Sequence, residues 1–158
     1  PTGDRMSRRI LEAASCSVLV ARPGGSLRSF PASITVGFDG SEVGAHAYEV
    51  SASIAAATGA SLRVVMADRG GSTGPARARS EFPGVPIDEI AADPPEVALL
   101  KAGTESDLVV VGRRGVHGSR DLGSVSARVA AFSPVSVLVV HRPWAGPARG
   151  EGAPGLSL

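Results

Sequence analysis

The chain has few aromatic residues, almost no lysine, one cysteine and no long hydrophobic run. Because Cys16 is the only cysteine in 158 residues, an internal disulfide framework is excluded, and we expect a reducing, cytoplasmic location. No apolar run approaches the ~20 residues that a membrane-spanning helix needs. The formal net charge is +1, so the sequence gives no electrostatic reason to bind nucleic acid or an anionic membrane.

Several sequence signatures of enzymes are also missing. No Gly-x-Ser-x-Gly elbow is present, and the single lysine, Lys101, does not follow a phosphate-binding glycine loop. No Gly-x-Gly-x-x-Gly follows the first predicted strand, which argues against a dinucleotide-dependent dehydrogenase. The three histidines and Cys16 lack the spacing of a metal site. We therefore expect a protein that is not an enzyme.

Hydrophobic residues make up 43% of the chain, which is enough for a packed core. Five apolar segments predict strands: 33–37, 61–67, 85–91, 108–111 and 136–141. Helical patterns lie between several of them, with ends near Thr58-Gly59, Gly103 and Phe132. Alternating strands and helices predict an α/β fold with a parallel sheet, and the run Val109–Val111 suits a strand buried on both faces.

Two of these helices have recognisable starts. The turn Asp39-Gly40-Ser41 is expected to cap the first helix, and one buried stripe is predicted at Val43, Ala47, Val50, Ile54 and Ala57. Before Gly103, Asp93 is expected as the N-cap residue and Pro94 as the first helical residue. The stretch 69–84 is rich in glycine and lacks an apolar period, so we expect no helix there.

The stretch Leu108–Ser126 carries the strongest functional signal. An apolar strand ends at a loop dotted with glycines, and the next helix begins at Ser124. Glycine allows the main chain to approach a ligand closely and to adopt positive φ. The helix start offers unpaired N–H groups and partial positive charge to an anion. This arrangement is typical of phosphate binding in α/β proteins.

Asp39 stands at the carboxyl end of the first strand of the complete domain. In a sheet of order 3-2-1-4-5 it lies beside the glycine loop that follows the fourth strand, at the point where strand order reverses. Asp39 is either a helix cap alone or a cap that also contacts a ligand. Arg113 and Arg114 either neutralise phosphate or are solvated loop charges, and His117 is a weaker candidate of the same kind.

The chain contains an internal repeat. Residues Arg5–Pro23 resemble Ser124–Pro143, with Ser7 aligned to Ser126 and Ser17–Val20 aligned to Ser136–Val139. Repeats of this size indicate duplicated structural units, although chance similarity between two arginine-rich helix and strand pieces is the alternative. A lone helix and strand cannot bury their apolar faces.

Taken together, these motifs resemble the universal stress protein family. The matching pieces are ITVGFDGSE, DPPEVALLKAG, LVVVGRRG and LGSVSARV running into VSVLVVHRP. The resemblance implies a Rossmann-like open parallel five-stranded sheet of order 3-2-1-4-5. It implies a universal stress domain at 33–143, a remnant of a preceding repeat at 1–23, a linker at 24–32 and a disordered tail at 144–158.

Some family members bind ATP through a Gly-x-x-Gly, nine-residue gap, Gly-Ser/Thr pattern. Gly112 and Gly115 match the first pair and Gly123-Ser124 the last, but only seven residues separate Gly115 from Gly123. The resemblance implies adenine-nucleotide contacts, with Asp39 at the ribose or adenine and Met66 giving its main chain to adenine. The implied site residues are Gly37, Phe38, Asp39, Met66, Gly112, Arg113, Gly115, Gly123, Ser124, Val125 and Ser126.

We therefore expect ATP binding, with Mg²⁺ accompanying the nucleotide, in stress response or signalling and with little or no catalysis. The alternative is an interaction module with a degenerate site whose function is dimerisation. The family commonly pairs through the last strand, here Ser136–His141, as a homodimer or between tandem domains. We expect Cys16–Ala21 to pair antiparallel with that strand, from the same chain or from a partner.

Overall fold

The computed structural model describes residues 2–23, 30–67, 80, 84, 87–90, 94–113 and 122–141. Six strands form one sheet in the order β1-β6-β5-β2-β3-β4. Their bounds are β1 (Val18–Val20), β2 (Ser33–Phe38), β3 (Ser61–Ala67), β4 (Ile87–Ile90), β5 (Leu108–Gly112) and β6 (Ser136–Val140). The five neighbouring strands β6, β5, β2, β3 and β4 are all parallel and follow the predicted order. The predicted fold class is confirmed, and β1 adds a sixth strand at the edge.

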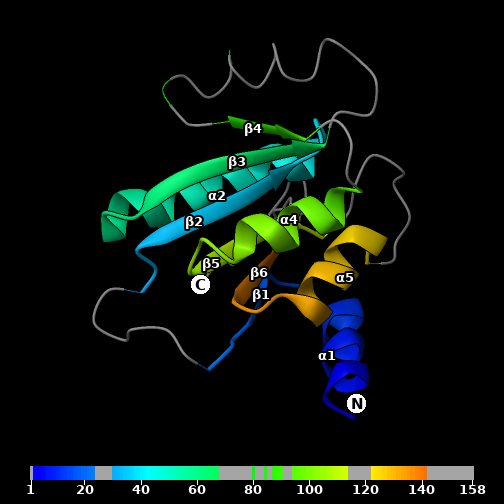
Figure 1. Ribbon diagram of the computed structural model, residues 1–158. Helices are drawn as coiled ribbons and strands as arrows, with labels where there is room; N and C mark the ends of the chain where they lie inside the picture. Colours follow the sequence, from blue (N-terminus) through cyan, green and yellow to red (C-terminus); the bar gives the residue numbers. More distant parts are fainter. Residues whose placement is uncertain are drawn as a thin grey trace, which may run out of the picture.

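The helices are α1 (Thr2–Ala13), α2 (Glu42–Thr58), α4 (Pro95–Gly103) and α5 (Ser124–Phe132). Figure 1 shows α2 on one face of the sheet and α4, α5 and α1 on the other. The chain leaves β2 through α2 toward β3, and it leaves β5 through α5 toward β6. Because these two connections run in opposite directions, strand order reverses between β2 and β5.

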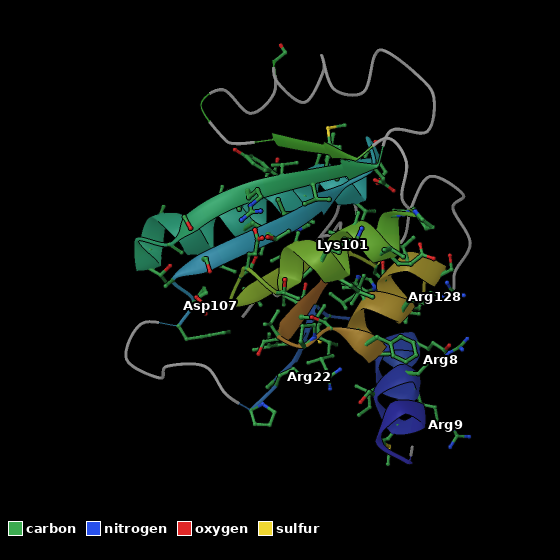
Figure 2. The ribbon with its side chains drawn as sticks, viewed as in Figure 1. Arg8, Arg9, Arg22, Lys101, Asp107 and Arg128 are labelled. Carbon is green, nitrogen blue, oxygen red and sulfur yellow. The ribbon has the colours of Figure 1, made fainter. Side chains whose placement is uncertain are left out.

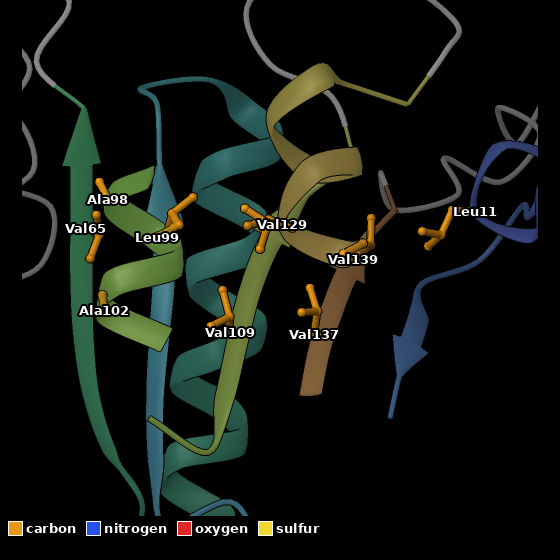
Figure 3. Packing of buried hydrophobic residues seen from close by; sticks show 11 residues of the cluster. Leu11, Val65, Ala98, Leu99, Ala102, Val109, Val129, Val137 and Val139 are labelled. Carbon is orange, nitrogen blue, oxygen red and sulfur yellow. The ribbon is translucent and has the colours of Figure 1, made fainter. Parts of the chain in front are cut away.

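Each face of the sheet carries its own hydrophobic cluster. Side chains alternate along β5, so Val109 and Val111 pack under α4 and α5, whereas Val110 packs under α2. Figure 3 shows the first cluster, which includes Leu99 of α4 and Leu11 of α1. Burial on both faces explains why the central strands are continuous apolar runs rather than alternating ones.

Helix α2 ends as the sequence predicts, but its buried stripe differs. Its C-cap, Gly59, has a φ of 74°, which favours glycine. The fully buried positions are Gly44, Ala47 and Ser51, and Ala57 is exposed, so the predicted stripe was wrong at its end. The helix approaches the sheet through its small residues, which an apolar count does not detect.

Helix α4 begins one residue later than predicted. Pro94 is the N-cap and Pro95 the first helical residue, so placing Pro94 inside the helix was wrong. Pro94 has an extended conformation, with φ −52° and ψ 137°. Steric clash with the proline ring disfavours the helical region for the preceding residue, and Pro94 precedes Pro95. Asp93, the expected cap, lies outside the described residues.

The N-terminal segment docks on the last unit of the sheet. Strand β1 pairs antiparallel with β6, with Val18 opposite Val139 and Val20 opposite Val137, which confirms the predicted antiparallel pairing and places it within this chain. Helix α1 lies beside α5 and buries Leu11, which is 3% exposed. The pairing covers an otherwise open hydrophobic edge of β6. The origin of this segment in a preceding repeat stays a prediction.

Other expectations fall wholly or mostly outside the described residues. Of the stretch 69–84 the structure describes Ser80, which is helical, so the expectation of no helix was wrong at that residue, and Gly84, which is at a turn with a φ of 81°. Most of the linker 24–32 and all of the tail 144–158 are likewise outside. Within the described ranges, no helix has the length and apolarity needed to cross a membrane.

Candidate functional site at the carboxyl edge of the sheet

The two predicted motifs meet where strand order reverses. Strands β2 and β5 are parallel neighbours, with Ile34 opposite Leu108 and Val36 opposite Val110. Their carboxyl ends therefore lie at the same edge of the sheet. Asp39 follows β2 directly and Arg113 follows β5 directly. Ligands of open α/β sheets bind at such a position.

Asp39 organises the turn into α2 rather than capping it directly. One carboxylate oxygen, Oδ1, accepts from the Ser41 N–H at 3.0 Å and from the Ser41 hydroxyl at 2.6 Å. Ser41 is the N-cap, and its Oγ accepts from the Gly44 N–H at 3.0 Å. Asp39 is exposed, and within the described part of the chain Oδ2 has no hydrogen-bond partner. The turn therefore holds a carboxylate at the edge, with one oxygen available to a ligand.

Two glycines at this edge let elements approach closely. A Cβ on Gly112 would lie 2.8 Å from Val43 Cγ1 and 3.2 Å from the Val43 carbonyl oxygen. A Cβ on Gly37 would meet the side chain of Leu99 at 3.1 Å. Gly112 is thus required by the first turn of α2, and Gly37 accommodates α4. Packing explains both glycines without a ligand, and their contribution to nucleotide binding stays a prediction.

The base of the glycine loop is tied together by main-chain bonds. The Arg113 N–H donates to the Val140 carbonyl at 2.8 Å, and the Gly123 N–H donates to the Arg113 carbonyl at 2.9 Å. Arg113 therefore touches the residue from which α5 begins. Gly123 is the N-cap of α5 and provides no side-chain cap. The N–H groups of Ser124–Ser126 precede the first intrahelical bond, from Ala127 to Gly123, and have no acceptor within the helix.

The first turn of α5 has two different serines. Ser124 is exposed at the helix start. Ser126 is buried, and its hydroxyl donates to the Gly112 carbonyl at 2.6 Å, fixing the helix to the end of β5. Val125 lies between them and packs against the hydrophobic cluster. Of these three residues, only Ser124 presents a side chain that a ligand can reach without breaking a hydrogen bond or leaving the core.

The structure places two further predicted residues in the core. Phe38 and Met66 lie opposite each other in the β2–β3 register, and both side chains are buried under α2. A ligand at the edge would meet their main chain rather than their side chains. The expectation for Met66 concerned its main chain, and it stays a prediction.

Arg113 has a contact that the sequence did not reveal. Its side chain is 7% exposed, so it is not a solvated loop charge. Its Nη1 and Nη2 donate to the carbonyl oxygens of Ala14 and Glu12, at the end of α1. A cation at the C-terminus of a helix neutralises carbonyls that have no intrahelical partner. These carbonyls lie 99 and 101 residues away along the chain, so no local signal could have indicated them.

Two other polar residues hold the fold together away from the site, and Figure 2 labels both. Arg22 donates to the carbonyls of Ala130, Ala131 and Ser133 at the end of α5, at 2.7, 3.0 and 3.2 Å. Asp107 lies at the opposite, amino edge of the sheet and joins the start of β2 to the start of β5. Sequence reasoning missed both residues.

The remaining candidates give little support to other chemistry. His46 contacts Glu49 on α2, with Nδ1 3.2 Å from Oε2, and the His141 main chain donates to Ser17 Oγ. Gly115, Arg114 and His117 lie outside the described residues. In the described part of the chain, no three histidine, cysteine or acidic residues are grouped so that they could hold a metal ion.

Comparisons with known proteins agree with this architecture. The family model described as "Universal stress protein family" matches residues 75–141. A universal stress protein solved in complex with cAMP is 31% identical, with a TM-score of 0.55, and the match covers 70% of this chain and 97% of that one. No curated protein matches the chain in sequence.

Two further structures are similar. A universal stress protein from Archaeoglobus fulgidus DSM 4304 is 25% identical with a TM-score of 0.69, and the match covers 86% of this chain. The chain spans only 53% of that longer protein. UspA from Lactobacillus plantarum is 20% identical with a TM-score of 0.57, over 68% of this chain and 96% of that one, and shows likeness of fold.

Proposed function

Because the chain belongs to the universal stress protein family, we propose that it binds an adenine nucleotide at the carboxyl edge between β2 and β5. The observation that carries this proposal is the start of α5. Three consecutive N–H groups, Ser124–Ser126, have no intrahelical acceptor there, and the N-cap residue, Gly123, has no side chain to cap them. Such a helix start binds phosphate through its N–H groups and its partial positive charge.

The other predicted contacts surround this helix start. The phosphates would accept from the N–H groups of α5 and from the Ser124 hydroxyl, and Oδ2 of Asp39 would accept from a ribose hydroxyl. The related protein solved with cAMP supports an adenine nucleotide as the ligand. Because only seven residues separate Gly115 from Gly123 where the ATP pattern has nine, the loop either turns more tightly or presents fewer N–H groups to the phosphates.

The proposal is binding without catalysis, as a sensor of nucleotide in cytoplasmic stress response or signalling. Asp39 is a carboxylate at this edge, and it is engaged in the turn before α2. Mg²⁺ would arrive with ATP, held chiefly by the phosphates. The specific observation favouring an interaction module instead is that Arg113, which follows β5 at the base of the loop, is bound to α1.

Calorimetric titration with ATP and with cAMP tests the proposal, using two variants of Ser124. The substitution Ser124→Glu adds a carboxylate at the first helical position, which stabilises the helix but repels phosphate. Ser124→Gln has the same size without the charge. We expect millimolar or tighter binding by the wild type and by Ser124→Gln, and loss of binding with Ser124→Glu at an unchanged or higher melting temperature.

Absence of binding heat with both nucleotides, for the wild type, would exclude nucleotide binding and leave the interaction module. Equal binding by the two variants would place the phosphates somewhere other than the start of α5. Nucleotide analysis of protein purified without added ligand provides an independent check.

A further inference from the structure

We propose that α1 inhibits the nucleotide site by sequestering Arg113, and that nucleotide and α1 compete for its guanidinium. The inference rests on the proposed nucleotide site. We call the bonds from Arg113 Nη1 and Nη2 to the carbonyls of Ala14 and Glu12 the α1 clamp. The clamp removes from solvent the cation that follows β5 directly.

Arg113 is positioned so that its guanidinium can bind either the carbonyls at the end of α1 or a phosphate at the start of α5. Its carbonyl accepts from the Gly123 N–H at 2.9 Å, so its main chain touches the residue that precedes α5. By strand alternation its side chain lies on the same face as Val109 and Val111, which is the face that carries α5. Rotation about its own side-chain bonds would therefore move the guanidinium from the end of α1 toward the start of α5.

The clamp does not satisfy the whole guanidinium. Nη1 and Nη2 each have a carbonyl partner, but Nε is buried and has no hydrogen-bond partner among the described residues. A buried donor without a partner is costly. The carbonyls are also neutral acceptors, whereas a phosphate accepts through charged oxygens, and its bidentate bonds to arginine are stronger. A phosphate within reach is therefore the preferred partner of Arg113.

The rest of the α1 contact can be weakened without touching Arg113. Leu11 is 3% exposed and anchors α1 in the cluster under α5. Leu11→Ala removes most of that anchor and should favour undocking of α1. Arg22→Gln is the matched control, because Arg22 also binds carbonyls at a helix C-terminus in the same interface, but at the end of α5.

Calorimetric titration with ATP is done on the wild type, Leu11→Ala, Leu11→Ala/Arg113→Gln and Arg22→Gln. We expect Leu11→Ala to bind ATP about tenfold more tightly, the gain of one charge-assisted hydrogen bond. We expect the double variant to lose that gain and Arg22→Gln to bind as the wild type does. Affinity that is unchanged or lower in Leu11→Ala, or a gain that survives in the double variant, would overturn the inference.

A second measurement uses the wild type alone. Binding linkage is reciprocal, so saturating ATP must weaken the clamp by the factor by which undocking strengthens ATP binding. We expect amide exchange in the last turn of α1 to become up to about tenfold faster with ATP. Unchanged or slower exchange there would overturn sequestration while leaving nucleotide binding intact. If none of the four proteins gives binding heat, the proposed function itself fails, and the inference fails with it.

Discussion

Leu19 and Leu138 lie opposite each other at the centre of the β1–β6 pair, and they occupy equivalent positions in the sequence repeat. The residues on either side, Val18–Val20 and Val137–Val139, pair in the same antiparallel register. In an isologous interface both partners use the same surface, so every contact is matched by an equivalent contact with the two roles exchanged, as in two-fold dimers. The contact between the N-terminal segment and the domain has that form within one chain.

Two hydrogen bonds at the ends of the pair show the same reciprocity. The His141 N–H donates to Ser17 Oγ at 3.0 Å, and the Arg22 N–H donates to Ser136 Oγ at 3.1 Å. Ser17 and Ser136 are equivalent in the repeat, and Arg22 and His141 are equally spaced after them. Each serine hydroxyl thus accepts a main-chain N–H from the opposite segment at one end of the pair. The equivalent positions of the sequence repeat thus make equivalent contacts, and the origin of the repeat in a duplicated unit stays a prediction.

Deletion of residues 1–23 should cause the chain to dimerise or precipitate. The deletion would leave β6 as an unpaired, apolar edge strand, which invites pairing with another chain. Its isologous register allows β6 of a second copy to replace β1, with Leu138 opposite Leu138. Sedimentation velocity of the deletion variant and the full chain at equal concentration measures this. A soluble, monomeric variant with an unchanged melting temperature would show that β1 neither stabilises the domain nor protects β6 from pairing with another chain.

The substitution Gly112→Ala should cost about 1–3 kcal/mol in the free energy of unfolding, the range for overpacking. Its Cβ would meet a β-branched side chain at 2.8 Å and the Val43 carbonyl at 3.2 Å, so the first turn of α2 must shift. Gly37→Ala is the matched control, because its Cβ meets only the flexible end of Leu99, at 3.1 Å. Urea unfolding compares the two. A cost for Gly37→Ala equal to or above that for Gly112→Ala would contradict this account.

Most of the fold could be predicted because its local signals are strong and agree with each other. Helix α5 has the predicted bounds, Ser124–Phe132, since Gly123 and Ser133 flank a short apolar pattern. The predicted start of α4 was one residue early because Pro94 was placed inside the helix, although the residue before a proline disfavours the helical region. The buried stripe of α2 was misjudged because Gly44 and Ser51 lack the apolar character by which burial is recognised.

The candidate site was predictable in position but not in its internal bonding. Parallel strands bring Asp39 and Gly112 to one edge, and topology alone implies this. The role of Arg113 depends on where α1 docks, and docking is a tertiary contact with no counterpart in local sequence. Asp107 was missed for the same reason, because its partners begin a strand about 75 residues earlier.

Asp107→Ala should destabilise the protein without changing nucleotide affinity. Its Oδ2 accepts from the N–H groups of Ala32 and Ser33, at 2.9 and 3.0 Å. Hydrogen bonds to a charged group contribute about 1.5–3 kcal/mol each, and the exposed bond to Ala32 contributes less, so we expect a loss of about 2–3 kcal/mol. Asp107→Asn keeps an acceptor oxygen and should lose less. Urea unfolding measures both variants, and an effect on ATP affinity without loss of stability would contradict the assignment.

The serines Ser124 and Ser126 should separate binding from stability. The Ser126 hydroxyl is already engaged with the Gly112 carbonyl at 2.6 Å, and the residue is 5% exposed. Ser126→Ala should therefore cost about 1 kcal/mol of stability, because it leaves that carbonyl without its donor. Ser124 is exposed at the helix start, so Ser124→Ala should change stability by at most about 0.5 kcal/mol.

The effect on ATP binding should have the opposite order. Ser124→Ala removes a hydroxyl that can reach a phosphate at the start of α5, and we expect affinity to fall several-fold. Ser126→Ala removes a hydroxyl that faces the strand, so affinity should change less than twofold. Urea unfolding measures the stability of each variant, and calorimetric titration measures its ATP affinity. If Ser126→Ala weakened ATP binding more than Ser124→Ala did, the buried hydroxyl would have to turn toward the ligand, and the static bond to Gly112 would not describe the bound state.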